Sequence, residues 1–317
     1  MIIDAHAHIF PAVQGRIKGG ETRSAGYGKI RVGTDQMLRV LPPTAIETVH
    51  PPEVLIEYMN WAGVDKTVLL QGTFYGACNR YAAEAIQRWP EQFMGAAFLD
   101  PWAPGARKMF DVAVGELGFQ AIKLELSEAA GLSGIHPGLR LDDPEVTWLW
   151  EALEQHDYLL TLDLGAIGSI SYQTAAVQNI IDQHPQIRIV IAHLCQPNPA
   201  AEQSEGLWKA WKEQISLAQH PNIWLDTAAL PAYLTEEGYP FSSARRYLQM
   251  AVDLVGADKI MWGTDVPGLL TVATYRQLVA LGWYHTNFLS PEDQAGIMGL
   301  NAWRVYGKAS FDQAGHS

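Results

Sequence analysis

Two histidines two residues apart lie near the start of the chain. His6 and His8 directly follow the apolar run Ile2–Asp4, and on an extended chain side chains two residues apart point to the same side. About 6–7 Å separates such side chains along a strand, so both imidazoles can bind one divalent metal ion. The alternative is a pair of histidines in a polar loop, because His-x-His alone is a weak signal.

Further ionisable residues lie at or near the ends of later apolar runs. They are Lys123, Glu125, Asp163, His193 and Asp265. Lys123 and Glu125 are again two residues apart and share one side of their run. Buried charges are costly unless they pair with one another or bind a metal. A set of this composition therefore favours a metal site over ordinary core packing.

Eight short apolar runs must position these side chains. Runs that are apolar almost throughout are typical of strands buried on both faces of a parallel sheet, and here they are Ile2–Asp4, Lys66–Leu70, Met94–Leu99, Ala121–Leu126, Leu159–Leu164, Arg188–Ala192, Ile223–Asp226 and Lys259–Trp262. Amphipathic segments separate them, which predicts an α/β fold: a single (β/α)8 barrel, or TIM barrel, with a doubly wound sheet as the alternative. In a barrel, the ionisable residues lie at the carboxyl ends of the strands, where active sites are built.

Helix start and stop signals lie between the apolar runs. Pro51-Pro52-Glu53 predicts a helix that ends at Gly63, and Asp143-Pro144 and Ser290-Pro291 predict two further helix starts. Three histidines lie where a predicted helix ends and a strand follows, which predicts a stabilising role at the opposite face of the barrel: His156, His184 and His220.

The segment Pro11–His50 is far longer than an ordinary connection between a strand and a helix. We expect it to be a functional insertion, a loop over the barrel mouth, within a single domain of residues 1–317. Its cationic residues predict an acidic substrate, because arginine binds carboxylates through paired hydrogen bonds. The candidate substrate-binding residues of the insertion are Arg16, Arg23 and Arg31. The alternative is a loop whose charges face water.

Composition excludes several classes of protein. The chain has 317 residues, 48% of them hydrophobic, and a net charge of −12. This acidity argues against nucleic acid as a partner, and no apolar run reaches the roughly 18–20 residues of a membrane span. Two cysteines do not form a disulfide framework. We therefore expect a cytoplasmic protein that binds a small molecule; a homodimer or homotetramer is compatible with the sequence.

Four segments in the right order resemble one family of barrel enzymes. They are Asp4-Ala5-His6-Ala7-His8, the segment Gly118–Leu124 around Lys123, Ala192-His193-Leu194 and Trp262-Gly263-Thr264-Asp265, followed by the closing run Asn301–Tyr306. With them the chain resembles the amidohydrolase superfamily, and within it the amidohydrolase-related branch that includes aminocarboxymuconate-semialdehyde decarboxylase and several lactone hydrolases. The resemblance spans almost the whole chain, but it does not specify a substrate.

The resemblance implies one catalytic divalent metal ion, zinc in the first place and manganese as the alternative. It implies His6, His8 and Asp265 as ligands, and His193 as a further ligand or as the group that polarises the substrate. The usual histidine of the fifth strand is replaced by Asp163, which then binds the ion or orients a neighbour. Lys123 and Glu125 are expected to contact the substrate. Asp265 would act as general base and His193 would stabilise charge on the attacked carbonyl oxygen.

Three functions remain open at this point. The first is hydrolysis of an amide, ester or lactone by a water molecule that the metal activates. The second is non-oxidative decarboxylation of an aromatic or unsaturated carboxylic acid, in which the metal holds substrate oxygens and an acid protonates the carbon. The third is a non-catalytic barrel that serves as a binding module. Metal analysis separates the third function from the first two.

Overall fold

Nine short strands of the computed structural model form the wall of a barrel. The structure describes residues 1–43 and 46–307. The strands are β1 (Ile3–Ala7), β6 (Lys66–Leu69), β7 (Phe93–Gly95), β8 (Ala97–Phe98), β9 (Ala121–Glu125), β10 (Leu159–Asp163), β11 (Arg188–Ile191), β12 (Ile223–Asp226) and β13 (Ile260–Met261). Neighbours pair in parallel, in the orders β1-β6-β7 and β13-β12-β11-β10-β9-β8.

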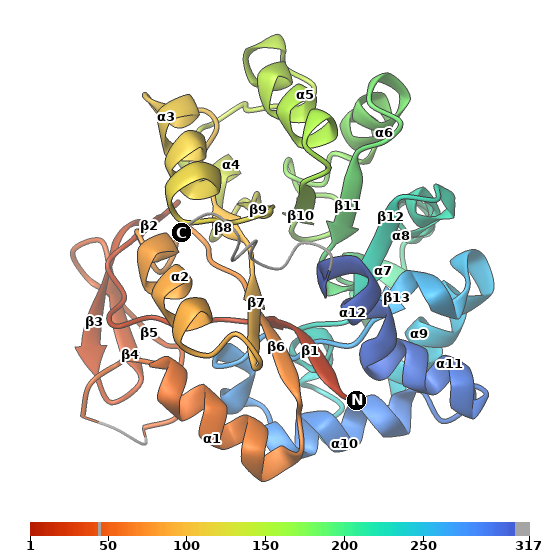
Figure 1. Ribbon diagram of the computed structural model, residues 1–317. Coiled ribbons are helices and arrows are strands. Elements are labelled where there is room, and N and C mark those ends of the chain that lie inside the picture. Colours follow the sequence, from red (N-terminus) through yellow and green to blue (C-terminus); the bar gives the residue numbers. More distant parts are fainter. Residues whose placement is uncertain (44–45, 308–317) are drawn as a thin grey trace.

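Two junctions join these sheets into one barrel. At the first, the predicted third strand is interrupted at Ala96, so that β7 pairs with β6 and β8 pairs with β9. At the second, β1 bonds to the segment that follows β13: Ala5 N donates to Trp262 O (3.0 Å), and Asp265 N donates to His6 O (2.8 Å). The predicted (β/α)8 barrel is confirmed, with strands in the centre and helices around them (Figure 1).

The helices follow the local signals in the sequence. They are α1 (Pro52–Ala62), α2 (Asn79–Arg88), α3 (Ala106–Asp111), α4 (Leu132–Ile135), α5 (Thr147–Gln155), α6 (Thr174–Gln183), α7 (Pro199–Glu202), α8 (Glu205–Ser216), α9 (Ser242–Val255), α10 (Tyr275–His285), α11 (Pro291–Ala295) and α12 (Asn301–Tyr306). Gly63 ends α1 with a left-handed φ of 74°. Ser290 caps α11, and His156 and His184 are the C-caps of α5 and α6, as predicted.

The barrel interior is apolar at one end and polar at the other. Ile3, Ala5 and Leu159 are fully buried there, and α12 closes this end with Val305 and Tyr306. Figure 1 shows α12 lying across the near end of the barrel. The polar residues begin one layer further along the strands, at the carboxyl ends, so the apolar end stabilises the fold and leaves the opposite end for chemistry.

The insertion Pro11–His50 is a small sheet rather than the loop that we expected. Its antiparallel strands are β2 (Arg16–Ile17), β3 (Gly20–Gly26), β4 (Lys29–Val32) and β5 (Gln36–Arg39), in that order. It lies beside α1 and α2, in red at the left of Figure 1. Only one face is buried, as the alternation of exposed and buried residues in β4 shows, and such strands carry too few apolar residues to form apolar runs. No described helix is long and apolar enough to cross a membrane.

Candidate metal centre

A bulge in β1 turns the histidine pair toward the barrel interior. Ile3 and Ala5 face the interior, and strict alternation would turn His6 and His8 outward. The pairing with β6 shifts between Asp4 and Ala7, where two residues of β1, Ala5 and His6, oppose one residue of β6, Val68. This extra residue reverses the alternation, as β-bulges do. The rings of His6 and His8 then lie 5.1 Å apart, centre to centre.

Each of the two histidines has one ring nitrogen held by an acceptor. His8 Nδ1 lies 2.7 Å from the carbonyl oxygen of Leu70, and His6 Nδ1 lies 3.0 Å from Asp226 Oδ2. These acceptors fix the protons on Nδ1, so the Nε2 lone pairs remain for another partner. Burial lowers the pKa of both histidines, which favours the neutral form that a metal needs.

Asp265 completes a set of three metal-ligand atoms. It follows β13 in a left-handed conformation with φ of 65°, which is uncommon for residues other than glycine, although aspartate adopts it more readily than most. Its Oδ1 lies 2.8 Å from His8 Nε2 and 3.9 Å from His6 Nε2. The three atoms lie within 4.8 Å of one another, and two imidazoles with a carboxylate are a common donor set for zinc. The residues fit the predicted metal ion.

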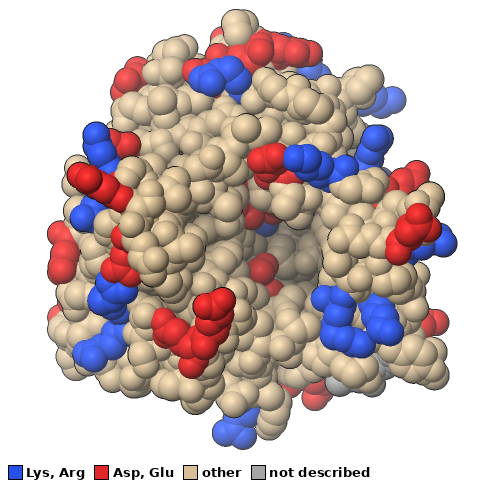
Figure 2. Space-filling view, turned by 180° about the vertical axis from the view of Figure 1, so that it is seen from behind, with Lys and Arg blue, Asp and Glu red and all other residues tan. Residues whose placement is uncertain are grey.

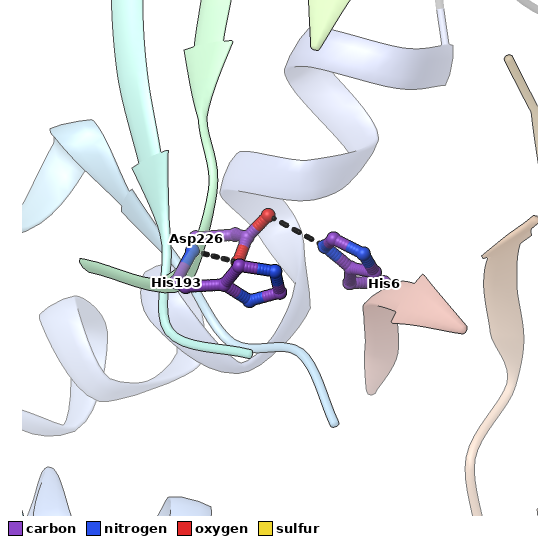
Figure 3. Close-up of side chains that lie close together, drawn as sticks. All are labelled: His6, His193 and Asp226. Carbon is purple, nitrogen blue, oxygen red and sulfur yellow. Dashed lines mark hydrogen bonds and ion pairs between the residues drawn. The ribbon is translucent and has the colours of Figure 1, made fainter. Parts of the chain in front are cut away.

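Asp226, which the sequence analysis overlooked, connects two of the histidines. Its carboxylate lies between them in Figure 3: Oδ2 accepts from His6 Nδ1, and Oδ1 accepts from the backbone N–H of His193 at 2.9 Å. The rings of His6 and His193 stack with 4.7 Å between their centres. His6, His193 and Asp226 form a second set of close potential ligand atoms. The sequence feature that could have identified Asp226 is its position as an acidic residue at the end of the seventh apolar run.

Asp163 contacts His193. Asp163 Oδ2 lies 3.1 Å from His193 Nε2, and His193 Nδ1 lies 3.1 Å from the carbonyl oxygen of Ala228. Burial alone would lower the pKa of His193, but the Asp163 carboxylate raises it to about 10. His193 begins a turn in which residues 193–196 all have φ between 47° and 63°. Such backbone strain is concentrated at functional sites.

Lys123 and Glu125 lie beside the histidines at the end of β9. Lys123 is buried, and its Nζ lies 3.1 Å from His6 Nε2 and 3.6 Å from Glu125 Oε2. A positive charge therefore already lies at the His6 lone pair. Burial, with the neighbouring Asp163 carboxylate, raises the pKa of Glu125 to about 7. The structure brings both residues together with the predicted ligands.

Asp4 is a second residue whose position the sequence analysis did not assign. Its carboxylate accepts hydrogen bonds from Thr264 N (2.8 Å), Tyr275 Oη (3.0 Å) and His6 N (3.2 Å). Burial raises its pKa to about 7, against these hydrogen bonds. Asp4 therefore ties the histidine strand to the segment that carries Asp265.

A cavity of about 730 Å³ opens above these residues. His8, Lys123, Glu125, Asp163, His193 and Asp265 line it, together with many apolar side chains. Figure 2 shows this face hollowed, with acidic side chains inside the hollow. Arg16, Arg23 and Arg31 are exposed and are not among the lining residues; Arg23 pairs with Glu21. Lys18 and Arg39 are the cations of the insertion that line the cavity.

Comparisons with known proteins agree with this architecture. The family profile described as Amidohydrolase matches residues 3–308. L-fucono-1,5-lactonase of Burkholderia ambifaria is 26% identical over 84% of this chain and 89% of its own length. Gamma-resorcylate decarboxylase of Rhodococcus jostii is 28% identical over 60% and 64%. The crystal structure of a Burkholderia multivorans amidohydrolase with bound zinc shares the fold, with a TM-score of 0.69 and 18% identity over 97% of this chain and 99% of that chain.

Proposed function

The chain belongs to the amidohydrolase family, and from this membership we propose that it is a metal-dependent enzyme that hydrolyses an amide, ester or lactone bond in a small carboxylated molecule. The observation that carries the proposal is the convergence of His6 Nε2, His8 Nε2 and Asp265 Oδ1 beside a cavity that His8 and Asp265 line. The acceptors at Nδ1 leave Nε2 of both histidines with a lone pair. That of His6 faces the Lys123 ammonium at 3.1 Å, which a metal ion would displace. The third atom belongs to a carboxylate that lines the cavity.

We assign His6, His8 and Asp265 as ligands of one divalent ion, zinc in preference to manganese. Neutral imidazoles with one carboxylate suit zinc, and the zinc in the Burkholderia multivorans amidohydrolase supports the choice. When bound, the ion lowers the pKa of a water molecule and polarises a carbonyl group. Asp163 and His193 stand next to this set as an ion pair, and we assign them to its surroundings rather than to the ligand set.

The side chains around the ligands suit the steps of hydrolysis. Asp265 is a quarter exposed, so its carboxylate can accept a proton from water and pass it to the leaving group. The Lys123 ammonium lines the cavity and can donate to an oxygen on which negative charge develops. Both ring nitrogens of His193 have acceptors, so His193 contributes its positive charge to the site rather than a free N–H group.

Decarboxylation is the second candidate, because a decarboxylase is among the relatives. Hydrolysis comes first because the lactonase aligns with a larger share of this chain than the decarboxylase does. The cavity also provides a proton donor, the Lys123 ammonium, that could protonate a carbon atom in a decarboxylation. The two reactions therefore differ in their products rather than in the residues they require.

The test is to supply the zinc-loaded protein with six-membered lactones and, separately, with 2,6-dihydroxybenzoate. We expect acid release from a lactone without gas, measured by pH titration, and loss of this activity in Asp265→Asn. Carbon dioxide release from the benzoate without lactone hydrolysis would make the protein a decarboxylase. Protein that binds no metal and turns over neither class would be a binding module. The variant His220→Asn serves as control, because His220 lies just before the start of β12, whereas the proposed ligands lie at the carboxyl ends of the strands.

A further inference from the structure

The charged side chains that line the cavity form pairs. Lys18 Nζ lies 2.5 Å from Glu128 Oε1, and Lys123 Nζ lies 3.6 Å from Glu125 Oε2. His193 pairs with Asp163, and Asp265 lies against His8. Arg39 also lines the cavity, and no carboxylate of residues 1–43 or 46–307 forms an ion pair with it. Each of the other lining cations has a carboxylate partner within the protein.

Arg39 is held in place while part of its guanidinium group stays free. Its Nη1 donates to the carbonyl oxygens of Tyr27 (2.8 Å) and Leu41 (3.4 Å). Its Nε and Nη2 have no hydrogen-bond partner among the residues that the structure describes. These two groups are two of the donors with which arginine binds a carboxylate. The carbonyl oxygens of Tyr27 and Leu41 therefore position an arginine whose remaining donors are available.

The neighbourhood of Arg39 makes an anion favourable there. In the sheet, Arg39 of β5 lies directly opposite Lys29 of β4. Side chains of directly opposite residues are neighbours on one face, and two like charges there repel one another. A bound carboxylate would reduce this repulsion. No described carboxylate pairs with Lys29 either.

We propose that Arg39 binds the carboxylate of the substrate and that the cavity selects molecules with one carboxylate over those with none or two. With the metal ion occupied by the scissile group, Arg39 sets this number, because it is the one lining cation of the described residues without a carboxylate partner; Lys18 pairs with Glu128 and Lys123 with Glu125. The cavity wall also includes Leu41, Phe74, Tyr75 and Tyr233. These side chains suit an apolar or planar ring. The preferred substrate is therefore a ring compound with one carboxylate, and its scissile group lies at the metal centre.

A binding experiment tests the anion site without any turnover. Benzoate, benzamide and isophthalate are titrated calorimetrically into the zinc-loaded protein. We expect benzoate to bind at least about tenfold more tightly than benzamide, and Arg39→Gln to remove that difference. Arg31→Gln is the matched control, because Arg31 is an exposed arginine of the same sheet that does not line the cavity. Benzoate affinity that is unchanged in Arg39→Gln would mean that the carboxylate binds elsewhere, for example at the metal, and would overturn the proposal.

A second variant tests the number of carboxylates. Glu128→Gln leaves the Lys18 ammonium without its partner, so the cavity gains a second unpaired cation. In the unaltered protein, we expect isophthalate to bind no more tightly than benzoate. In Glu128→Gln, the ratio of isophthalate affinity to benzoate affinity should rise about tenfold. Isophthalate that already binds better in the unaltered protein, or an unchanged ratio in the variant, would refute the selection for one carboxylate.

The substrate part of this inference rests on the proposed function, and a turnover experiment separates the two. A ring-matched series of lactones with no, one or two carboxylates is hydrolysed by the unaltered protein, by Arg39→Gln and by Arg31→Gln. We expect kcat/KM to be highest for the monocarboxylate and to fall about tenfold in Arg39→Gln, mainly through KM. Equal kcat/KM values for all lactones of the series would refute this inference alone. Arg39-dependent benzoate binding without hydrolysis would refute the hydrolase function alone.

Discussion

The Asp163 carboxylate lies 3.1 Å from Nε2 of His193, and both side chains are almost completely buried at the carboxyl ends of β10 and β11. With Nδ1 bonded to the Ala228 carbonyl oxygen, the imidazole has an acceptor at each nitrogen, an arrangement that favours the protonated ring. Asp163 occupies the position where the sequence resemblance implied a histidine ligand. In this protein, the fifth and sixth strands therefore contribute an ion pair next to the proposed metal ligands.

Asp163→Asn tests this arrangement. We expect metal affinity to fall by no more than about 100-fold, because Asp163 acts through His193. The pKa of His193 should fall, because burial then acts without the opposing carboxylate. Titration of the His193 ring by NMR and metal competition with a chelator measure the two effects. Near-complete loss of the metal would instead make Asp163 a ligand, and wild-type affinity with wild-type turnover would exclude it from both roles.

Metal analysis tests the ligand set itself. Purified protein should hold close to one divalent ion per chain, and the double substitution of His6 and His8 to Ala should remove it. At a free zinc concentration of about 100 times Kd, the unaltered protein should gain about 2.7 kcal/mol of unfolding free energy, and the double variant should gain none. Elemental analysis and thermal unfolding provide the measurements. His156→Ala, an exposed histidine at the end of α5, is the control; metal content unchanged in the double variant would exclude this site.

Asp226→Asn tests the support of His6. The carboxylate fixes the proton on His6 Nδ1 and increases the electron density at Nε2. We expect the substitution to weaken zinc binding by about 10- to 100-fold while far-ultraviolet circular dichroism stays unchanged. Asp182→Asn, an exposed aspartate on α6, should have no effect. Equal zinc affinity in both variants would show that Asp226 only stabilises the fold.

The buried side chain of His50 should make the unfolding free energy of the protein sensitive to acid. It lies buried at the end of the insertion, its Nε2 has no partner among the described residues, and its ring faces Tyr58 and Phe10. Burial, with a smaller contribution from His8, lowers its pKa to about 3. The unfolded chain binds a proton at this residue below about pH 6.5 and the folded chain does not, so the unfolding free energy decreases as the pH falls from 6.5 towards 3.

His50→Phe should remove this effect. Between these pH values, we expect the unfolding free energy of the variant to fall less steeply than that of the unaltered protein. The two slopes should differ by up to about 1.4 kcal/mol per pH unit. Urea unfolding at pH 7.5, 6, 5 and 4.5 measures the slope, and His156→Phe provides a control at an exposed position. His50→Gln is a second variant for the case that the larger ring does not fit. Parallel curves for all these proteins would contradict the prediction.

The barrel itself was predictable because its strands are buried on both faces. Such strands must be apolar almost throughout, and the predicted run Leu159–Leu164 overlaps β10 (Leu159–Asp163) within a residue. The same logic places His193 and Asp265 at the carboxyl ends of strands, because all parallel strands of a barrel end on one face. The insertion sheet escaped prediction because its strands are mostly polar, and pairing between them, rather than local hydrophobicity, forms them.

The details of the site depend on contacts between residues far apart in the sequence. Alternation along β1 would place His6 outside the barrel, and only the bulge in its pairing with β6 turns it inward. Asp226 is 220 residues from its partner His6, and Arg39 reaches the cavity only because the insertion folds as a sheet. Residue types and local periodicity therefore specify the strands and the kinds of ligand. Register, tautomer and charge pairing arise only when distant segments pack together, since hydrogen bonds and ion pairs depend on distances that no local pattern contains.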